Sequence, residues 1–241
     1  MKHSKILMLH WKTLIILAFC LSIPFISIWY IVNYVNKDIF FEQKSEHLMS
    51  IALMLNTQLD ESGYDNILKE AGVEGAPREK QIAVLNKALS KITDEVSEVS
   101  EGLGVGFYSR ELDAILTYGP SSAYADRVGV SIDTDHPGRE VMATNKPLVV
   151  MGTMVRGNIM NAMCPIVRNG EVIGYIWANE LVSDLELALQ KTSNLVLVLL
   201  IISYIFMFVI IVAFLKKMLH AEQSSRAVIA KALEETQHLD G

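Results

Sequence analysis

Cysteine is nearly absent from this sequence, which contains only Cys20 and Cys164. Cys20 lies in a long apolar run and Cys164 in a separate block, so we expect no disulfide between them and none within that block. The sequence has no C-x-x-C-H haem attachment motif and no Cys or His pair at metal-binding spacing. We therefore predict no metal site and no cofactor, and a domain stabilised by a hydrophobic core.

Charge is absent from two long stretches, residues 14–32 and 195–215. A helix of roughly 20 apolar residues crosses the hydrocarbon core of a bilayer, so both stretches predict transmembrane helices and make the lipid bilayer a partner. The predicted organisation is an N-terminal segment at 1–13, transmembrane helices at 14–34 and 195–215, a folded domain at 35–194 between them, and a helical tail at 216–241.

The distribution of lysine predicts the orientation. Lys2, Lys5 and Lys12 precede the first apolar run without any acid, and Lys216 and Lys217 follow the second. The block between the runs holds 14 Lys and Arg against 23 Asp and Glu, a net charge of −9. Because basic residues are enriched at cytoplasmic membrane ends, we expect both termini in the cytoplasm and the acidic block outside the membrane. An acidic surface also argues against nucleic acid as a partner.

A cleaved signal peptide is the alternative explanation of the first apolar run. The run is longer than the usual signal core, and no small-x-small cleavage pattern follows it. Trp29, Tyr30 and Tyr34 cluster at its outer end, as aromatic residues do at a membrane interface. These features favour an uncleaved anchor, with a kink expected at Pro24.

Two helices are expected before any strand. Apolar residues recur at helical spacing over 35–59, and Ser62-Gly63 ends this first helix. They recur again over 77–99, where the opposite face of the predicted helix is charged. A short helix over 138–145 is predicted after Pro137, which suits a first helical turn.

Strand patterns dominate the rest of the block. Asn169-Gly170 predicts a tight hairpin, and Ser183-Asp184 predicts the start of a helix that enters the second span. The fold class is therefore α+β, with a five-stranded antiparallel sheet. The expected strands are 103–108, 112–118, 148–155, 159–167 and 172–179.

Three stretches carry a resemblance to a known family. They are GFYSRELDAILTYGP at 106–120, DHPGREVM at 135–142 and MVRGNIMNAMCPI at 154–166. Together with the two-span layout, they resemble the extracytoplasmic single Cache (PAS-like) sensor region of bacterial membrane histidine kinases and receptors, over roughly residues 10–216. The resemblance implies a PAS-like domain with a ligand cavity over the sheet, bounded by helices and loops.

Catalysis is not expected from these 241 residues. The family's kinases continue into dimerisation and ATP-binding domains, and His238 lacks the usual phosphoacceptor context. We expect no catalytic residue here, and a chain that is either a fragment of a longer kinase or chemoreceptor or a partner of a separately encoded kinase. The helical pattern over 215–237 is compatible with pairing in a homodimer or with a simple cytoplasmic stub.

Nine residues are candidates for ligand binding, in three groups. Tyr108, Arg110 and Tyr118 surround the first predicted hairpin, where the fork of Arg110 matches a carboxylate unless it pairs with Glu111 or Asp113. The second group is His136, Gly138 and Arg139, and the third is Arg156, Asn158 and Asn161.

The second and third groups each have a structural alternative. A helix that begins near Pro137 presents N–H groups to an anion beside His136 and Arg139, but capping by Asp135 and a salt bridge explain the same residues. Asn161 interrupts an apolar strand and must face solvent or a polar cavity, whereas Arg156 with its following glycine is also compatible with a plain turn.

These features favour a transmembrane sensory receptor that binds a small anionic ligand, such as a carboxylate, and relays binding to a kinase-type output. The alternative is a non-catalytic membrane protein whose outer domain binds another protein. An extracytoplasmic enzyme is disfavoured, because no nucleophile has a plausible base and no catalytic carboxylate pair is recognisable.

Overall fold

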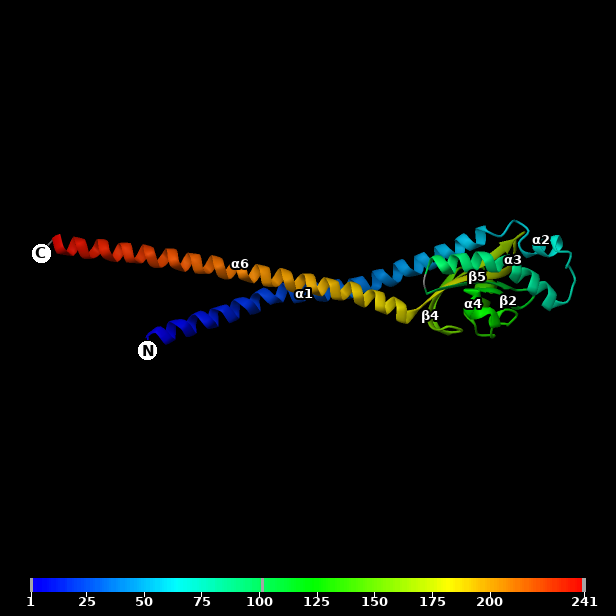
Figure 1. The fold of residues 1–241 in the computed structure, drawn as a ribbon, viewed down its shortest axis with the longest axis horizontal. Helices are drawn as coiled ribbons and strands as arrows, with labels where there is room; N and C mark the ends of the chain where they lie inside the picture. Colours follow the sequence, from blue (N-terminus) through cyan, green and yellow to red (C-terminus); the bar gives the residue numbers. More distant parts are fainter. Residues whose placement is uncertain (1, 101, 240–241) are drawn as a thin grey trace. The chain divides into compact units, whose positions relative to one another are not determined.

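The computed structural model describes residues 2–100 and 102–239. The chain divides into two compact units (Figure 1). One unit combines Met1–Asn36 with Lys191–Gly241, and the other is Lys37–Gln190.

The first unit is built from parts of two long helices, α1 (Lys2–Thr57) and α6 (Val182–Leu239). Both helices are long and apolar enough to cross a membrane by length and composition. The Tyr204 hydroxyl donates to the carbonyl of Ala18 at 3.0 Å, and the Ser193 hydroxyl donates to the Asn33 side chain. Pro24 lies inside α1, and the helix continues past it.

The second unit contains a five-stranded antiparallel sheet with the order β2-β1-β5-β4-β3. This confirms the predicted α+β fold with its PAS-like sheet. The predicted hairpin is also confirmed, since Asn169 and Gly170 both have positive φ between the paired Arg168 and Glu171. The strands are β1 (Leu103–Ser109), β2 (Ala114–Gly119), β3 (Leu148–Met154), β4 (Gly157–Arg168) and β5 (Glu171–Leu181).

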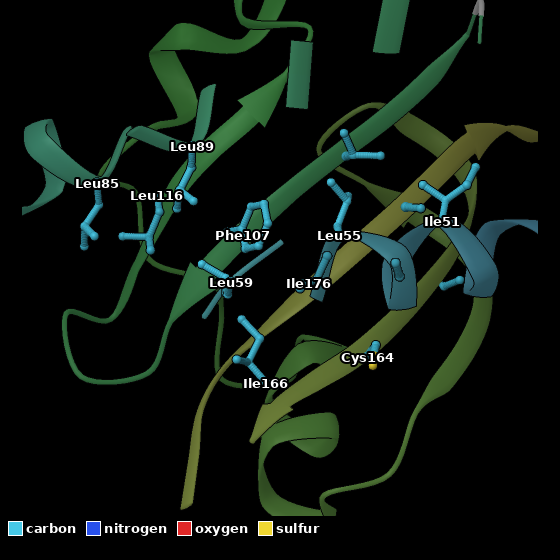
Figure 2. Packing of buried hydrophobic residues seen from close by; sticks show 14 of the residues in the cluster. Ile51, Leu55, Leu59, Leu85, Leu89, Phe107, Leu116, Cys164, Ile166 and Ile176 are labelled. Atoms are coloured by element: carbon cyan, nitrogen blue, oxygen red, sulfur yellow. The ribbon is translucent and has the colours of Figure 1, made fainter. Parts of the chain in front are cut away.

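One face of the sheet forms the main core with the helices α1, α2 (Tyr64–Glu70) and α3 (Arg78–Val99). Alternate residues of each strand point to this face, as the two-residue period of a strand requires. Figure 2 shows side chains from α1, α3, β1, β2, β4 and β5 gathered in one cluster. The labelled residues are Ile51, Leu55, Leu59, Leu85, Leu89, Phe107, Leu116, Cys164, Ile166 and Ile176.

Helix α2 was not predicted from the sequence, so three helices rather than two precede the sheet. It has only seven residues, too few to show a helical period. Tyr64 and Leu68 anchor it in the core, and Gly63 at φ 63° turns the chain into it. Tertiary packing therefore stabilises this helix.

The second strand also begins later than predicted, because Asp113 at φ 45° is part of a turn. No strand or helix was predicted between 118 and 138, but this part contains α4 (Ser121–Tyr124) and the 3-10 turn η1 (Ala125–Arg127). Helix α5 (Pro137–Thr144) follows. We call residues 120–136 the covering segment.

The other face of the sheet carries aromatic and polar side chains together with a few aliphatic ones. A second cluster of buried residues forms between this face and α5. It contains Tyr108, Ile115, Tyr118, Val141, Met142, Met163, Tyr175 and Trp177.

Candidate functional site

A small cavity of about 30 Å³ lies on this aromatic face. Strands β2, β4 and β5 form its floor, and the covering segment contributes Ile132 and His136. Such a space admits only one or two water molecules. The lining residues are Ile115, Tyr118, Ile132, His136, Met154, Val155, Ile159, Asn161, Tyr175, Trp177 and Asn179.

Arg156 lies beside the cavity with each guanidinium nitrogen bound. Its Nη1 donates to Asn179 Oδ1 at 2.8 Å, its Nη2 to the Gly102 carbonyl at 3.0 Å, and its Nε to the Tyr124 hydroxyl at 3.1 Å. The guanidinium carbon also lies 5.4 Å from the centre of the Tyr124 ring. A side chain at Gly104 would place a Cβ 2.5 Å from Nη1, so this glycine is needed for the arrangement.

Tyr118 receives the next hydrogen bond in this chain of contacts. Asn179 Nδ2 donates to the Tyr118 hydroxyl at 3.3 Å, while the Tyr118 ring stacks on Tyr124 at 4.6 Å. Burial raises the pKa of Tyr118, so its phenol stays protonated. Since Tyr118 accepts from Asn179 and has no acceptor for its own proton among the described residues, the hydroxyl is a donor available to the cavity.

His136 provides a second donor. Its Nδ1 accepts the backbone N–H of Gly138 at 2.9 Å, so His136 itself caps α5. The structural alternative of a cap from Asp135 is therefore wrong. An imidazole that accepts at Nδ1 carries its proton at Nε2. Burial lowers the pKa of His136, which also favours this neutral form.

Tyr175 provides a third donor from the middle of β5. Its side chain is 2% exposed, and within the described ranges its hydroxyl makes no hydrogen bond. Gly138 permits its position, because a Cβ there would lie 2.5 Å from Tyr175 Cζ and 2.7 Å from the hydroxyl. Burial raises the pKa of Tyr175 far above its usual range, so it too remains a neutral donor.

Asn161 presents the opposite chemistry. It is 3% exposed, and its Nδ2 lies 3.3 Å from the Met154 sulfur. Its Oδ1 is buried without a hydrogen-bond partner in the described part of the chain. An unpaired buried carbonyl oxygen is costly, at roughly 1–3 kcal/mol. The cavity is thus lined by three available donors and one available acceptor.

Arg139 and Tyr108 belong to a neighbouring polar network rather than to the cavity wall. Arg139 Nη1 lies 2.7 Å from Asp113 Oδ1, and its Nη2 donates to the Ile132 carbonyl at 2.8 Å. Asp113 also accepts from the Tyr108 hydroxyl at 2.6 Å and from Ser131 at 2.5 Å. Hydrogen bonds from Ser131, Tyr108 and Arg139 lower the pKa of Asp113 to about 2. We call Tyr108, Asp113, Ser131 and Arg139 the loop latch, because they hold the covering segment to β1 and α5.

Two predicted candidates lie away from the cavity. Arg110 is exposed and lines a separate open hollow of about 770 Å³ beside α2 and α3. Asn158 is exposed near the start of β4, opposite Thr153. Of the nine candidates, Tyr118, His136 and Asn161 line the cavity, while Tyr108, Gly138, Arg139 and Arg156 support it.

Sequence reasoning did not identify the three β5 residues of the cavity, Tyr175, Trp177 and Asn179. They recur with a period of two, which places them on one face of a strand. That spacing was available in the sequence. Its polar end at Asn179 was the signal that this face meets a polar cavity.

The cavity has the chemistry of a binding site for a small polar molecule. Among the described residues, no Asp or Glu belongs to its lining. In the described part of the chain, no group of three or more His, Cys, Asp or Glu side chains is placed to hold a metal ion. Arg156 adds positive charge just behind Asn179. Donors beside a guanidinium are the groups that bind a carboxylate.

Residues 10–187 match the family model described as the AtoS N-terminal domain. The signal transduction histidine-protein kinase AtoS of Escherichia coli (strain K12) is 40% identical over 196 residues, which is 81% of this chain and 31% of that protein. The chain therefore spans about a third of the length of the curated relative it matches.

Solved structures of sensor domains are also similar to the chain. The sensor domain of the V. cholerae histidine kinase DctB is 12% identical, with a TM-score of 0.48, over 69% of this chain and 61% of that one. The E. coli DcuS sensor domain is 13% identical, with a TM-score of 0.37, over 60% of this chain and 96% of that one. Since the family model matches most of the chain, and the predicted kinase-sensor resemblance agrees with it, this protein belongs to the AtoS N-terminal domain family.

Proposed function

We propose that this chain is the sensory part of a transmembrane receptor that binds a small carboxylate outside the membrane and relays binding to a kinase-type output. The observation that carries the proposal is the donor-rich cavity over the sheet. Tyr118, His136 and Tyr175 each have a proton without an acceptor in the residues described, and Arg156 lies behind Asn179. A carboxylate accepts several such hydrogen bonds at once.

Binding requires the cavity to enlarge, because about 30 Å³ is too small for an organic acid. The covering segment is the part that we propose to move. It is held to the sheet by polar contacts, namely the loop latch and the Arg156–Tyr124 hydrogen bond. Polar contacts near the surface are individually weak, so a ligand that replaces some of them shifts the segment at moderate cost.

Strand β5 supports a route for the signal. Tyr175, Trp177 and Asn179 line the cavity, and β5 ends at Leu181 directly before α6 begins at Val182. The strand is also joined to α1 by an ion pair between Glu180 and Lys44, 3.1 Å apart. A displacement of β5 by the ligand therefore changes α6 relative to α1 in this proposal, and both helices carry the change through the predicted spans. A homodimer would present two such helix pairs to the output.

A binding experiment on the full chain in lipid nanodiscs tests the proposal. Titration calorimetry with a panel of two- to six-carbon carboxylates should detect binding of at least one of them. Replacing Arg156 with Gln should weaken that binding at least about tenfold, because it removes the positive charge beside the cavity and the charge-assisted hydrogen bond that fixes Asn179, which is worth about 1.5–3 kcal/mol. The matched control is Arg110→Gln, which makes the same charge change at an exposed position outside the cavity.

Equal losses in the two variants would indicate a general charge effect and contradict a carboxylate site at Arg156. Absence of binding by every carboxylate, with the protein folded, would remove the small-ligand proposal. The alternative in which the outer domain binds another protein would then be the one to pursue.

A further inference from the structure

We infer that the ligand is a hydroxy acid, a small carboxylate that also carries a hydroxyl group able to donate a hydrogen bond to Asn161 Oδ1. This inference rests on the proposed function and adds the chemical class of the ligand. The observation behind it is the unpartnered Oδ1 of a side chain that is 97% buried at the cavity wall.

The polarity of the cavity wall requires two kinds of group on one molecule. Tyr118, His136 and Tyr175 offer donors, which a carboxylate satisfies. Asn161 Oδ1 offers only an acceptor, which a carboxylate repels. A ligand that fills the cavity therefore needs an acceptor group at one place and a donor at another. A hydroxy acid is the smallest organic acid that provides both without a second charge.

The orientation of the Asn161 amide follows from its neighbour. Its Nδ2 faces the Met154 sulfur at 3.3 Å, and a thioether is a weak acceptor. Turning the amide over would place its oxygen against the sulfur, so that two acceptors would face each other. The Nδ2 group therefore stays on the Met154 side, and Oδ1 is the atom that a ligand meets.

Other small acids fit this wall less well. Unsubstituted acids and keto acids have no proton for Oδ1, so they leave a buried oxygen unpaired. An α-amino acid has a donor, but its ammonium charge must be desolvated. Among the residues that the structure describes, no Asp or Glu lines the cavity to compensate for that charge. Selectivity against amino acids is therefore expected together with preference for a hydroxyl.

Titration calorimetry on the full chain in nanodiscs provides the test. The probes are two matched sets. The three-carbon set is propanoate, 2-hydroxypropanoate, 3-hydroxypropanoate, 2-oxopropanoate and alanine. The four-carbon set contains the acids with the same substituents on a chain that is one carbon longer. At least one hydroxy acid should bind about tenfold or more tightly than the unsubstituted and keto acids of the same length, since one satisfied buried acceptor is worth about that factor. The amino acids should bind more weakly still.

Asn161→Leu removes the acceptor at similar size, and it should abolish the preference by lowering affinity for the hydroxy acid alone. Asn158→Leu is the control on the same strand, since Asn158 is exposed and outside the cavity. It should leave the preference unchanged. If Asn161→Leu does not fold, the O-methyl ether of the best hydroxy acid replaces it as a probe on the natural protein. That ether keeps the oxygen without the proton, and it should bind as weakly as the unsubstituted acid.

The outcomes separate this inference from the proposed function. Carboxylates that bind with equal affinity regardless of the hydroxyl would overturn the inference and leave the receptor proposal standing. So would a preference that survives Asn161→Leu, or an ether that binds as well as the alcohol. No binding by any carboxylate would overturn the proposed function and this inference with it.

Discussion

At the scale of single residues, the two arginines near the cavity, Arg139 and Arg156, already bind groups of the protein itself. Arg139 is paired with Asp113 and the Ile132 carbonyl, and Arg156 with Asn179, Gly102 and Tyr124. Each guanidinium fixes a segment that covers or borders the cavity. A ligand-responsive fold needs such contacts, because they can be exchanged when the ligand arrives.

The loop latch should make stability depend on acid pH. Because hydrogen bonds lower the folded pKa of Asp113 to about 2, below an unfolded value of about 3.9, its contribution is full above about pH 4. That contribution is lost as pH falls toward 2. Asp113→Asn should therefore lower the Tm of the full chain at pH 7, and its difference from the natural protein should narrow between pH 4 and pH 2.

Thermal unfolding followed by circular dichroism over this pH range measures the effect. Asparagine tolerates the φ of 45° at this position, so backbone strain does not confuse the result. Glu111→Gln is the control, an exposed acid in the same turn, and its Tm difference should stay near zero throughout. A Tm difference between Asp113→Asn and the natural protein that does not change with pH would show that the loop latch does not cause the predicted dependence of stability on acid pH.

Gly138 should be sensitive to a single added methyl group. In Gly138→Ala the new Cβ would lie 2.5 Å from the Tyr175 ring, so either the ring or α5 must move. We expect a loss of about 1–3 kcal/mol in the free energy of unfolding, together with weaker carboxylate binding. Gly152→Ala is the control, because nothing lies within 4 Å of its Cβ position. Equal losses in the free energy of unfolding of Gly138→Ala and Gly152→Ala, measured by denaturant titration, would contradict this prediction.

Residue patterns predicted part of this site for identifiable reasons. Asn161 was recognisable because a polar amide interrupts an apolar strand, and His136 because it precedes a proline at a helix start. Arg110 and Asn158 carry the same polar turn chemistry, yet they face away from the cavity. Sequence alone does not distinguish a turn residue that faces solvent from one that faces a cavity, since the difference depends on strand pairing and on the path of the covering segment.

At the scale of elements, the β4–β5 hairpin is joined to the end of α1 by one side chain. Arg168 donates to the carbonyls of Asp60, Asn56 and Leu59 at 2.7, 2.9 and 3.2 Å. Carbonyls at the end of a helix have no partner within it, so Arg168 satisfies groups that would otherwise depend on water. The hairpin that continues into the cavity strand β5 is thereby attached to α1.

Removing this clamp should loosen the hairpin from the helix. Arg168→Ala is expected to lower the free energy of unfolding by about 1–3 kcal/mol, and to speed hydrogen exchange near the end of α1. Arg168→Lys should recover only part of the loss, since one ammonium cannot reach three carbonyls in fixed directions. Arg110→Ala serves as the control on the neighbouring exposed turn, with no change expected in exchange at α1. Full recovery with lysine would show that charge alone matters.

Elements were predictable where a local rule decides them. Apolar stretches separated by turn signals identified five strands, and Asn169-Gly170 identified the hairpin. Helix α2 depends instead on where Tyr64 and Leu68 meet the core, which no seven-residue window contains. The strand order was likewise not readable from the sequence, because the pairing of β1 with β5 joins segments far apart in the chain.

At the scale of the whole molecule, the proposal depends on which compartment holds each segment. The two apolar helices satisfy the length and composition of membrane spans. The lysines that flank them favour cytoplasmic termini. A cavity that binds ligands from outside the cell must lie on the opposite side of the membrane from both termini. The topology therefore decides whether the chain responds to an external ligand or to a cytoplasmic one.

Cysteine labelling in intact cells tests this topology. Cys164 is 4% exposed, and burial raises the pKa of its thiol, so it should react slowly even if the domain that contains it faces the exterior, as we propose. In a background with Cys20→Ser and Cys164→Ala, Asp65→Cys should react with a membrane-impermeant maleimide in spheroplasts. Ser224→Cys should react only after the membrane is permeabilised, since it follows the second span. The two substitutions lie at exposed positions, so differences in labelling report the compartment rather than burial. Labelling of Ser224→Cys in intact spheroplasts, with Asp65→Cys protected, would invert the receptor and leave the cavity facing the cytoplasm.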